Sequence, residues 1–178
     1  MLFKKTSIDG VYVIELEPHK DERGFFARTY CRNEFISHEL DPDIAQCSLS
    51  YSKCKGTLRG LHYQAEPSEE TKLVRCVKGK VFDVVVDIRP NSPTFGRWLG
   101  TELSEDNFRA LYIPKGCAHG FQTLEDNVIF LYQISSFYDP SAARTLRWDD
   151  PKWNIQWPRA ENLIISSKDK NAPMWHEK

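Results

Sequence analysis

A histidine, an arginine and a lysine lie on two neighbouring strand-like segments of this 178-residue chain. Arg59 and His62 belong to the run Thr57–Gln64, and Lys72 begins the run Lys72–Cys76. No second histidine or carboxylate stands at metal-ligand spacing beside His62, so the three residues suit proton transfer on an anionic substrate better than metal chemistry. The sequence therefore predicts an enzyme.

His62 has two interpretations. A single histidine in a strand is more often a core residue with satisfied ring nitrogens than a catalytic group. Its neighbours favour catalysis, because Arg59 and Lys72 would need a negative partner if they also faced inward, and a bound phosphate supplies one. Arg59 and His62 have opposite parity on a regular strand, so Gly60 is predicted to host a β-bulge that re-aims one of them.

A second histidine, His119, follows a turn at Pro114–Gly116 and begins another predicted strand. A catalytic metal needs three or more ligands that converge on one point, and His62 with His119 provides two. The HxH-plus-Glu spacing of metal-binding barrels is missing. We therefore expect no catalytic metal.

Asp83 stands among valines in the run Val81–Ile88. A carboxylate in such a strand is costly if it is buried alone. Two interpretations are open: Asp83 lies on a solvated face, or it points into a polar barrel interior and orients a histidine or a lysine.

Short runs of alternating or apolar residues, bounded by turn residues, recur along the chain and are typical of a β-sandwich or barrel. Helical patterning is weak, with one short helix expected at Asn33–His38. No linker or internal repeat is visible, so we expect a single all-β domain over residues 1–178. Predicted strands cover Val11–Leu16, Gly24–Tyr30, Thr57–Gln64, Leu73–Val77, Val81–Ile88, Arg97–Leu103, Ala110–Ile113, Gly120–Leu124 and Val128–Ser135.

The formal net charge of −1 gives the molecule a weak overall field, which argues against wholesale nucleic-acid binding. Five cysteines without a CxxC pair predict reduced thiols. No apolar run approaches about 20 residues, so no membrane span is expected. Without an apolar leader of signal length, these features together predict a cytoplasmic protein.

Seven motifs occur in order along the chain. They are Arg23–Phe26, Gly56–Gln64, Lys72–Cys76, Ser92–Thr94, Ile113–Phe121, Arg147–Pro151 and Ser167–Asp169. Together they closely resemble the dTDP-4-dehydrorhamnose 3,5-epimerase family, and the match covers the chain from about Val11 to Pro173. No single motif would be specific, but the order and spacing of all seven are.

The resemblance implies a cupin-type jelly roll that acts as a homodimer on a nucleotide-linked 4-keto-6-deoxy sugar, without metal or other cofactor. His62 matches the family's catalytic base, Asp169 its dyad partner and Tyr132 the proton donor. Lys72 is the natural donor to the C4 oxygen of the sugar. Tyr138 matches the residue that stacks on the nucleotide base. The other matched substrate-binding positions are Arg23, Gln46, Arg59, His119 and Lys168.

Four positions depart from the family's usual residues. Arg28 and Ala143 stand where glutamates are usual, Ser48 replaces an asparagine, and Thr145 replaces a glycine. A glutamate accepts hydrogen bonds, whereas an arginine only donates them. We therefore expect a ligand preference that differs from dTDP-4-keto-6-deoxyglucose in the base, the sugar or both.

Three alternatives stay open. The first is an epimerase of C3 alone, or of a different nucleotide sugar such as a GDP- or CDP-linked one. The second is a metal-dependent barrel dioxygenase or isomerase. The third is a non-catalytic sugar-nucleotide binding module, which the set His62, Asp169 and Tyr132 argues against, since binding alone requires no base and no acid.

The expected homodimer would exchange N-terminal strands. The apolar run Val11–Leu16 lacks an obvious local hairpin partner. In that arrangement Arg23 and Phe26 would reach the neighbouring subunit's site.

Overall fold

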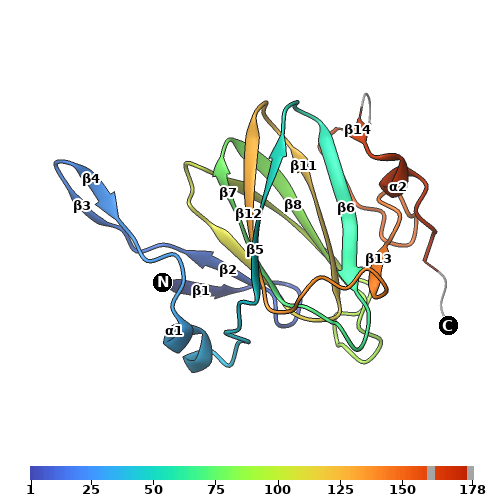
Figure 1. The fold of residues 1–178 in the computed structure, drawn as a ribbon, viewed down its shortest axis with the longest axis horizontal. Helices are drawn as coiled ribbons and strands as arrows, with labels where there is room; N and C mark the ends of the chain where they lie inside the picture. Colours follow the sequence, from blue (N-terminus) through green and yellow to red (C-terminus); the bar gives the residue numbers. More distant parts are fainter. Residues whose placement is uncertain (160–162, 176–178) are drawn as a thin grey trace.

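Two antiparallel sheets face each other in the computed structural model, which describes residues 1–159 and 163–175 (Figure 1). The first sheet has the strand order β1 (Leu2–Lys5), β2 (Tyr12–Glu15), β10 (Ala110–Ile113), β7 (Lys72–Lys78), β12 (Val128–Ile134) and β5 (Gln46–Ser52). The second has the order β13 (Ala143–Thr145), β6 (Thr57–Gln64), β11 (Cys117–Thr123), β8 (Lys80–Asp87) and β9 (Trp98–Ser104). The predicted all-β, jelly-roll architecture is confirmed.

The smaller elements lie around these sheets. Strand β14 (Ile164–Ile165) pairs in parallel with β6, and helix α2 (Ser167–Lys170) follows it directly. Helix α1 (Arg32–Ser37) confirms the short helix predicted at Asn33–His38, shifted by one residue. Strands β3 (His19–Asp21) and β4 (Gly24–Phe26) form a separate hairpin that projects away from the two sheets (Figure 1). No helix among the described residues is long and apolar enough to cross a membrane.

The hydrophobic core lies between the sheets and includes Phe121 of β11 and Phe130 of β12, whose rings stack at 4.6 Å between centroids. Burying a side chain of this size stabilises the fold by about 1.5–3 kcal/mol. Strand β8 is buried on both faces. Val85 belongs to the core between the sheets, whereas Val84 packs in a second cluster with Trp153, which lies beyond β13.

Asp83 lies on the same face of β8 as Val85, because side chains two residues apart share a face of a strand. It is fully buried, so the interpretation of Asp83 as a solvated residue is wrong. The carboxylate points into the interior and bonds to His119, as the second interpretation predicted.

Strand β2 is paired on both sides within its own chain. It forms a hairpin with β1 and also pairs with β10. The expectation that Val11–Leu16 lacks a local hairpin partner was therefore wrong. The partner, Leu2–Lys5, carries two lysines in four residues, which hides its strand character from a search for apolar runs.

Candidate active site

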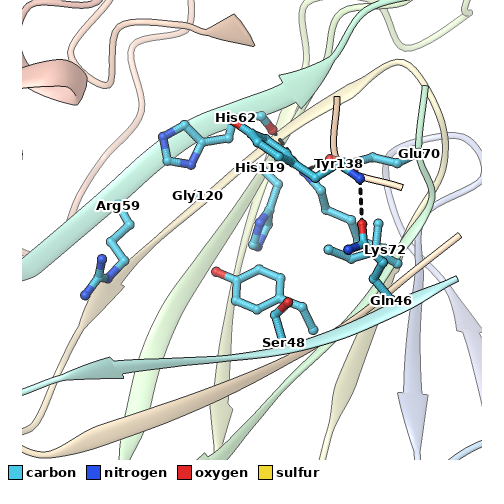
Figure 2. A pocket seen from close by; sticks show the side chains of 11 residues that line it. Gln46, Ser48, Arg59, His62, Glu70, Lys72, His119, Gly120 and Tyr138 are labelled. Carbon is cyan, nitrogen blue, oxygen red and sulfur yellow. Dashed lines mark hydrogen bonds and ion pairs between the residues drawn. The ribbon is translucent and has the colours of Figure 1, made fainter. Parts of the chain in front are cut away.

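Two adjoining cavities open between the sheets, with volumes of about 290 and 560 Å³. Arg59, His62 and Tyr132 line both of them. Most predicted site residues gather around this common space. The first cavity adds Gln46, Ser48, Lys72, His119 and Tyr138, all of them labelled in Figure 2. The second adds Lys168 and Asp169.

His62 and Asp169 form a hydrogen-bonded pair. The Nε2 atom of His62 lies 2.7 Å from Oδ1 of Asp169, and the backbone N–H of Gly60 donates to Oδ2 at 3.3 Å. Burial opposes ionisation of Asp169, but the bonds from His62, Gly60 and Ser166 hold its pKa below the usual range. An ionised carboxylate can only accept, so Nε2 of His62 donates to Asp169, and in the neutral ring Nδ1 is the nitrogen left to accept a proton.

Helix α2 positions Asp169 to accept the hydrogen bond from His62. The Ser166 side chain caps the helix by accepting a hydrogen bond from the backbone N–H of Asp169 at 3.1 Å. The Asp169 side chain is buried against β6, where the N–H of Gly60 meets it. Strand β14 holds the start of α2 beside β6, which explains how a residue 107 positions from His62 contacts its ring.

Tyr132 faces the same space from the opposite sheet. It belongs to β12, whereas His62 belongs to β6. Its ring packs edge-on against Phe130 and His119, at 5.1 and 6.0 Å between centroids. Burial, together with the negative charge of Asp83, raises the pKa of Tyr132 well above its usual value, so the phenol stays protonated. A base and a protonated acid therefore lie on opposite sides of one cavity.

Lys72, at the start of β7, lines the first cavity together with these two groups. Its ammonium contacts Oε1 of Glu70 at 3.0 Å and donates to the carbonyl oxygen of His62 at 3.2 Å. Beneath it, Nε2 of His119 lies 2.8 Å from Oδ1 of Asp83. Burial raises the pKa of Asp83, while His119 and Lys72 oppose that effect.

Two cations line the outer part of the site. Arg59 donates to Oγ of Ser52 at 3.2 Å and to the carbonyl oxygen of Tyr51 at 3.0 Å, which fixes its guanidinium over the edge of the first sheet. Lys168 reaches the second cavity from α2. Together they supply the positive charge that a diphosphate requires.

The predicted bulge at Gly60 is present. Strand β6 has one more residue than β11 between the pairs His119–His62 and Phe121–Arg59. Because of the added residue, the side chains of Arg59 and His62 point to the same face of β6, and both line the cavities. Gly60 has a φ of +118°, and a Cβ there would lie 2.6 Å from the Cα of Gly120 and 2.7 Å from the carbonyl oxygen of His119.

Gly60→Ala should therefore lower the free energy of unfolding by about 2–4 kcal/mol, because strain at positive φ adds to a backbone clash. Gly96→Ala is the matched control, since Gly96 has a φ of +79° but nothing within 4 Å of the added Cβ. Urea unfolding measures both changes. Equal decreases in the free energy of unfolding of the two variants would show that the close approach of Gly60 to Gly120 does not add to the effect of the substitution.

Four predicted site residues line neither cavity. Arg23 and Phe26 lie on the projecting hairpin, with Arg23 paired to Asp21. Arg28 pairs with Glu34 at 3.2 Å. The fourth, Ala143, pairs with Gln64 at the edge of the second sheet. Within one chain none of the four lines the cavities that contain His62, although Ala143 lies two residues from Thr145, which pairs with His62.

Glu70 lines the first cavity and was missed in the sequence. It stands beside Glu69 just before β7, where a pair of acidic residues is typical of a solvated loop. The available signal was its spacing of two from Lys72, because side chains two apart in extended chain share a face.

A metal site has no support in the residues that the structure describes, where no three side chains of His, Cys, Asp or Glu converge. His62 and His119 are each bonded to a different carboxylate, Asp169 and Asp83. The reaction without a cofactor stays a prediction.

Comparison with known proteins identifies one family of nucleotide-sugar epimerases. The family model for dTDP-4-dehydrorhamnose 3,5-epimerase matches residues 5–177. The enzyme of that name from Shigella flexneri is 46% identical over 169 residues, which cover 94% of this chain and 92% of the relative. This chain belongs to the dTDP-4-dehydrorhamnose 3,5-epimerase family.

Solved structures of epimerases have the same fold. The dTDP-4-dehydrorhamnose 3,5-epimerase from Elizabethkingia anophelis superposes with a TM-score of 0.96 at 38% identity, over 98% of this chain and 96% of that one. A dTDP-6-deoxy-D-glucose-3,5-epimerase from Legionella pneumophila, solved in complex with dTDP-4-keto-L-rhamnose, gives a TM-score of 0.91 at 40% identity, over 97% and 92% of the two chains.

Proposed function

We propose that this chain epimerises C3 and C5 of a dTDP-linked 4-keto-6-deoxy hexose by proton transfer alone. The observation that carries the proposal is the placement of the His62 imidazole, bonded through Nε2 to Asp169, and the Tyr132 phenol on opposite sides of one cavity. The dTDP-4-keto-L-rhamnose bound to the Legionella pneumophila relative supports this class of ligand.

The first step is removal of a proton from carbon. The ketone at C4 acidifies the hydrogens on C3 and C5, and Nδ1 of His62 accepts one of them. Asp169 then stabilises the imidazolium that forms. Carbon acids of this kind are much weaker than imidazolium, and each unit of pKa mismatch costs about 1.4 kcal/mol.

The second requirement is therefore a donor for the enolate. Its charge develops on the C4 oxygen, and the ammonium of Lys72 is the donor beside His62. A preorganised donor of this kind contributes about 3–4 kcal/mol. Tyr132 then protonates carbon from the opposite side, which inverts the centre. His62 releases its proton to solvent and Tyr132 regains one from solvent, and a second round inverts the other centre.

The remaining residues hold the nucleotide. Arg59 and Lys168 bind the diphosphate, and Tyr138 stacks on the base. The backbone N–H of Tyr138 donates to Oε1 of Gln46 at 2.5 Å, which anchors the segment after β12 at the cavity mouth. Ser48 lies opposite Tyr132 in the β5–β12 pair and shapes the cavity floor.

The test of this function is direct conversion. Pure enzyme, dialysed against a chelator, is incubated with dTDP-4-keto-6-deoxyglucose, and the sugar protons are followed by NMR. We expect inversion at both centres at the same rate before and after dialysis. No conversion of this sugar, with conversion of a GDP- or CDP-linked analogue, would contradict the proposal and favour the ligand shift expected from Arg28 and Ala143.

A homodimer would complete the site. The β3–β4 hairpin contains two strands of three residues each, and such a hairpin is marginally stable by itself. The hairpin exposes 84% of the Arg23 side chain at its turn and 76% of Phe26 at the opposite end. We infer that the hairpin extends into the cavity of a second copy, where Arg23 supplies a further cation to the diphosphate.

Mixing two inactive variants tests this arrangement. Arg23→Ala and His62→Ala should each be nearly inactive alone. After subunit exchange, about half of the dimers are mixed and each carries one intact site, so about a quarter of wild-type activity should return.

The control mixes His62→Ala with Tyr132→Phe, because those two residues belong to the same chain's cavity and no mixed dimer restores it. Light scattering gives the oligomeric state. Failure of the first mixture to recover activity, or a monomer that is fully active, would contradict the inference.

A further inference from the structure

Glu70 is a charged residue of the cavity wall that has no part in the steps above. Its side chain is 11% exposed, and that of its partner Lys72 is 7% exposed. A carboxylate and an ammonium so far from solvent are costly to bury unless each is well paired. The pair therefore needs an explanation beyond surface charge.

The contacts of the Lys72 ammonium give that explanation. An ammonium has three donors. Its nitrogen forms an ion pair with Glu70, 3.0 Å from Oε1, and donates a hydrogen bond to the carbonyl oxygen of His62 at 3.2 Å. Because these two contacts with the cavity wall orient the ammonium, we expect a remaining N–H to point at a bound sugar. Glu70, Lys72 and His62 all line this cavity (Figure 2).

The backbone on either side of Glu70 is itself held in place. The N–H of Thr71 donates to Oγ of Ser135 at 2.9 Å, and the N–H of Ser135 donates to the carbonyl oxygen of Thr71 at 3.1 Å. The hydroxyl of Ser136 donates to the carbonyl oxygen of Glu69 at 2.7 Å. Both serines directly follow β12, the strand of Tyr132. Glu70 is thus fixed relative to the proton donor as well as to the base.

We propose that Glu70 is a positioning residue that aims one N–H of Lys72 at the C4 oxygen where the enolate charge develops. The proposal rests on the proposed epimerase function and adds a residue to it. A lysine side chain has four flexible methylenes and loses rotamer entropy when it is fixed. The ion pair with Glu70 fixes the Lys72 side chain before the substrate binds, so this entropy is already lost and the donor is preorganised for the enolate.

The deciding comparison is Glu70→Gln against Glu70→Met. Both variants remove the charge and keep similar volume, but only glutamine offers Lys72 an oxygen acceptor. We expect kcat on dTDP-4-keto-6-deoxyglucose to fall about 10- to 100-fold in Glu70→Met, from misplacement of the donor. Glu70→Gln should stay within about threefold of wild type, and KM should change less than about twofold in both.

Two controls distinguish a change in the position of the Lys72 ammonium from a loss of the folded state. Glu69→Met changes the adjacent acidic residue, which does not contact Lys72, and should keep wild-type kcat. In a Lys72→Met background, Glu70→Met should cause no further loss, because no ammonium is left to aim. Thermal unfolding is measured for each variant. If Glu70→Met does not fold, Glu70→Asp replaces it, since shortening by one methylene also withdraws the acceptor and should slow kcat.

Wild-type kcat in Glu70→Met, or in Glu70→Asp where it replaces it, would overturn the proposal. Equal loss in Glu70→Gln and Glu70→Met, or the same loss with and without Lys72, would also overturn it. The outcome is distinct from failure of the proposed function. An inactive wild-type enzyme would reject the function, whereas an active wild type with an equally active Glu70→Met rejects the positioning role alone.

Discussion

His62→Ala should abolish exchange of the sugar's α-hydrogens with solvent while leaving dTDP binding nearly intact. In the proposed mechanism His62 takes the proton, whereas the diphosphate is held by Arg59 and Lys168, which line the second cavity. Loss of a positioned general base slows proton transfer by about 10²–10⁴-fold. Deuterium uptake followed by NMR gives the exchange rate, and calorimetry gives dTDP affinity.

Asp169→Asn is the matched variant for this prediction. It keeps the imidazole and nearly the same shape, but the amide can donate to Nε2 and so leave Nδ1 protonated, which removes the base. Exchange should fall nearly as far as in His62→Ala. Exchange at the wild-type rate in His62→Ala would show that another residue is the base.

Tyr132→Phe should separate exchange from inversion. His62 can still remove a proton and return it to the same side, so exchange with retained configuration should continue. Net epimer formation should fall by about 10²-fold or more, because no acid is left on the opposite side. Phenylalanine preserves the packing against Phe130 and His119, so the fold should survive.

Tyr63→Phe is the control for that change, since Tyr63 lies on the opposite side of β6 and packs with the outer cluster around Trp153. It should leave both rates unchanged. Equal losses of exchange and inversion in Tyr132→Phe would contradict the assignment of this residue as the acid.

The strands and the bulge could be predicted because their causes are local. Alternation of apolar residues with frequent turns indicated the two sheets, and the parity conflict between Arg59 and His62 required an extra residue at Gly60. The structure has that residue at the register shift between β6 and β11. The roles of Asp169 and Tyr132 came from the family resemblance, because no local pattern relates residues that are far apart in sequence.

What could not be predicted depends on tertiary contacts. The sequence of β8 left Asp83 with two interpretations, and burial of both faces of that strand decided between them. Glu70 resembles a solvated loop residue until the serines after β12 fix its backbone beside Lys72. Strand β1 was missed because a lysine-rich edge strand has little apolar signal.

The most direct test of the account is the number of deuterons in the product formed by wild-type enzyme in deuterated water. Dual inversion through an enolate, with His62 and Tyr132 on opposite sides of the ring, requires that C3 and C5 each exchange their hydrogen for solvent deuterium. Mass spectrometry and NMR of the product should therefore find two deuterons per sugar, one at each centre. Product without deuterium would contradict proton transfer by these residues, and a single deuteron at C3 would show that the enzyme inverts that centre alone.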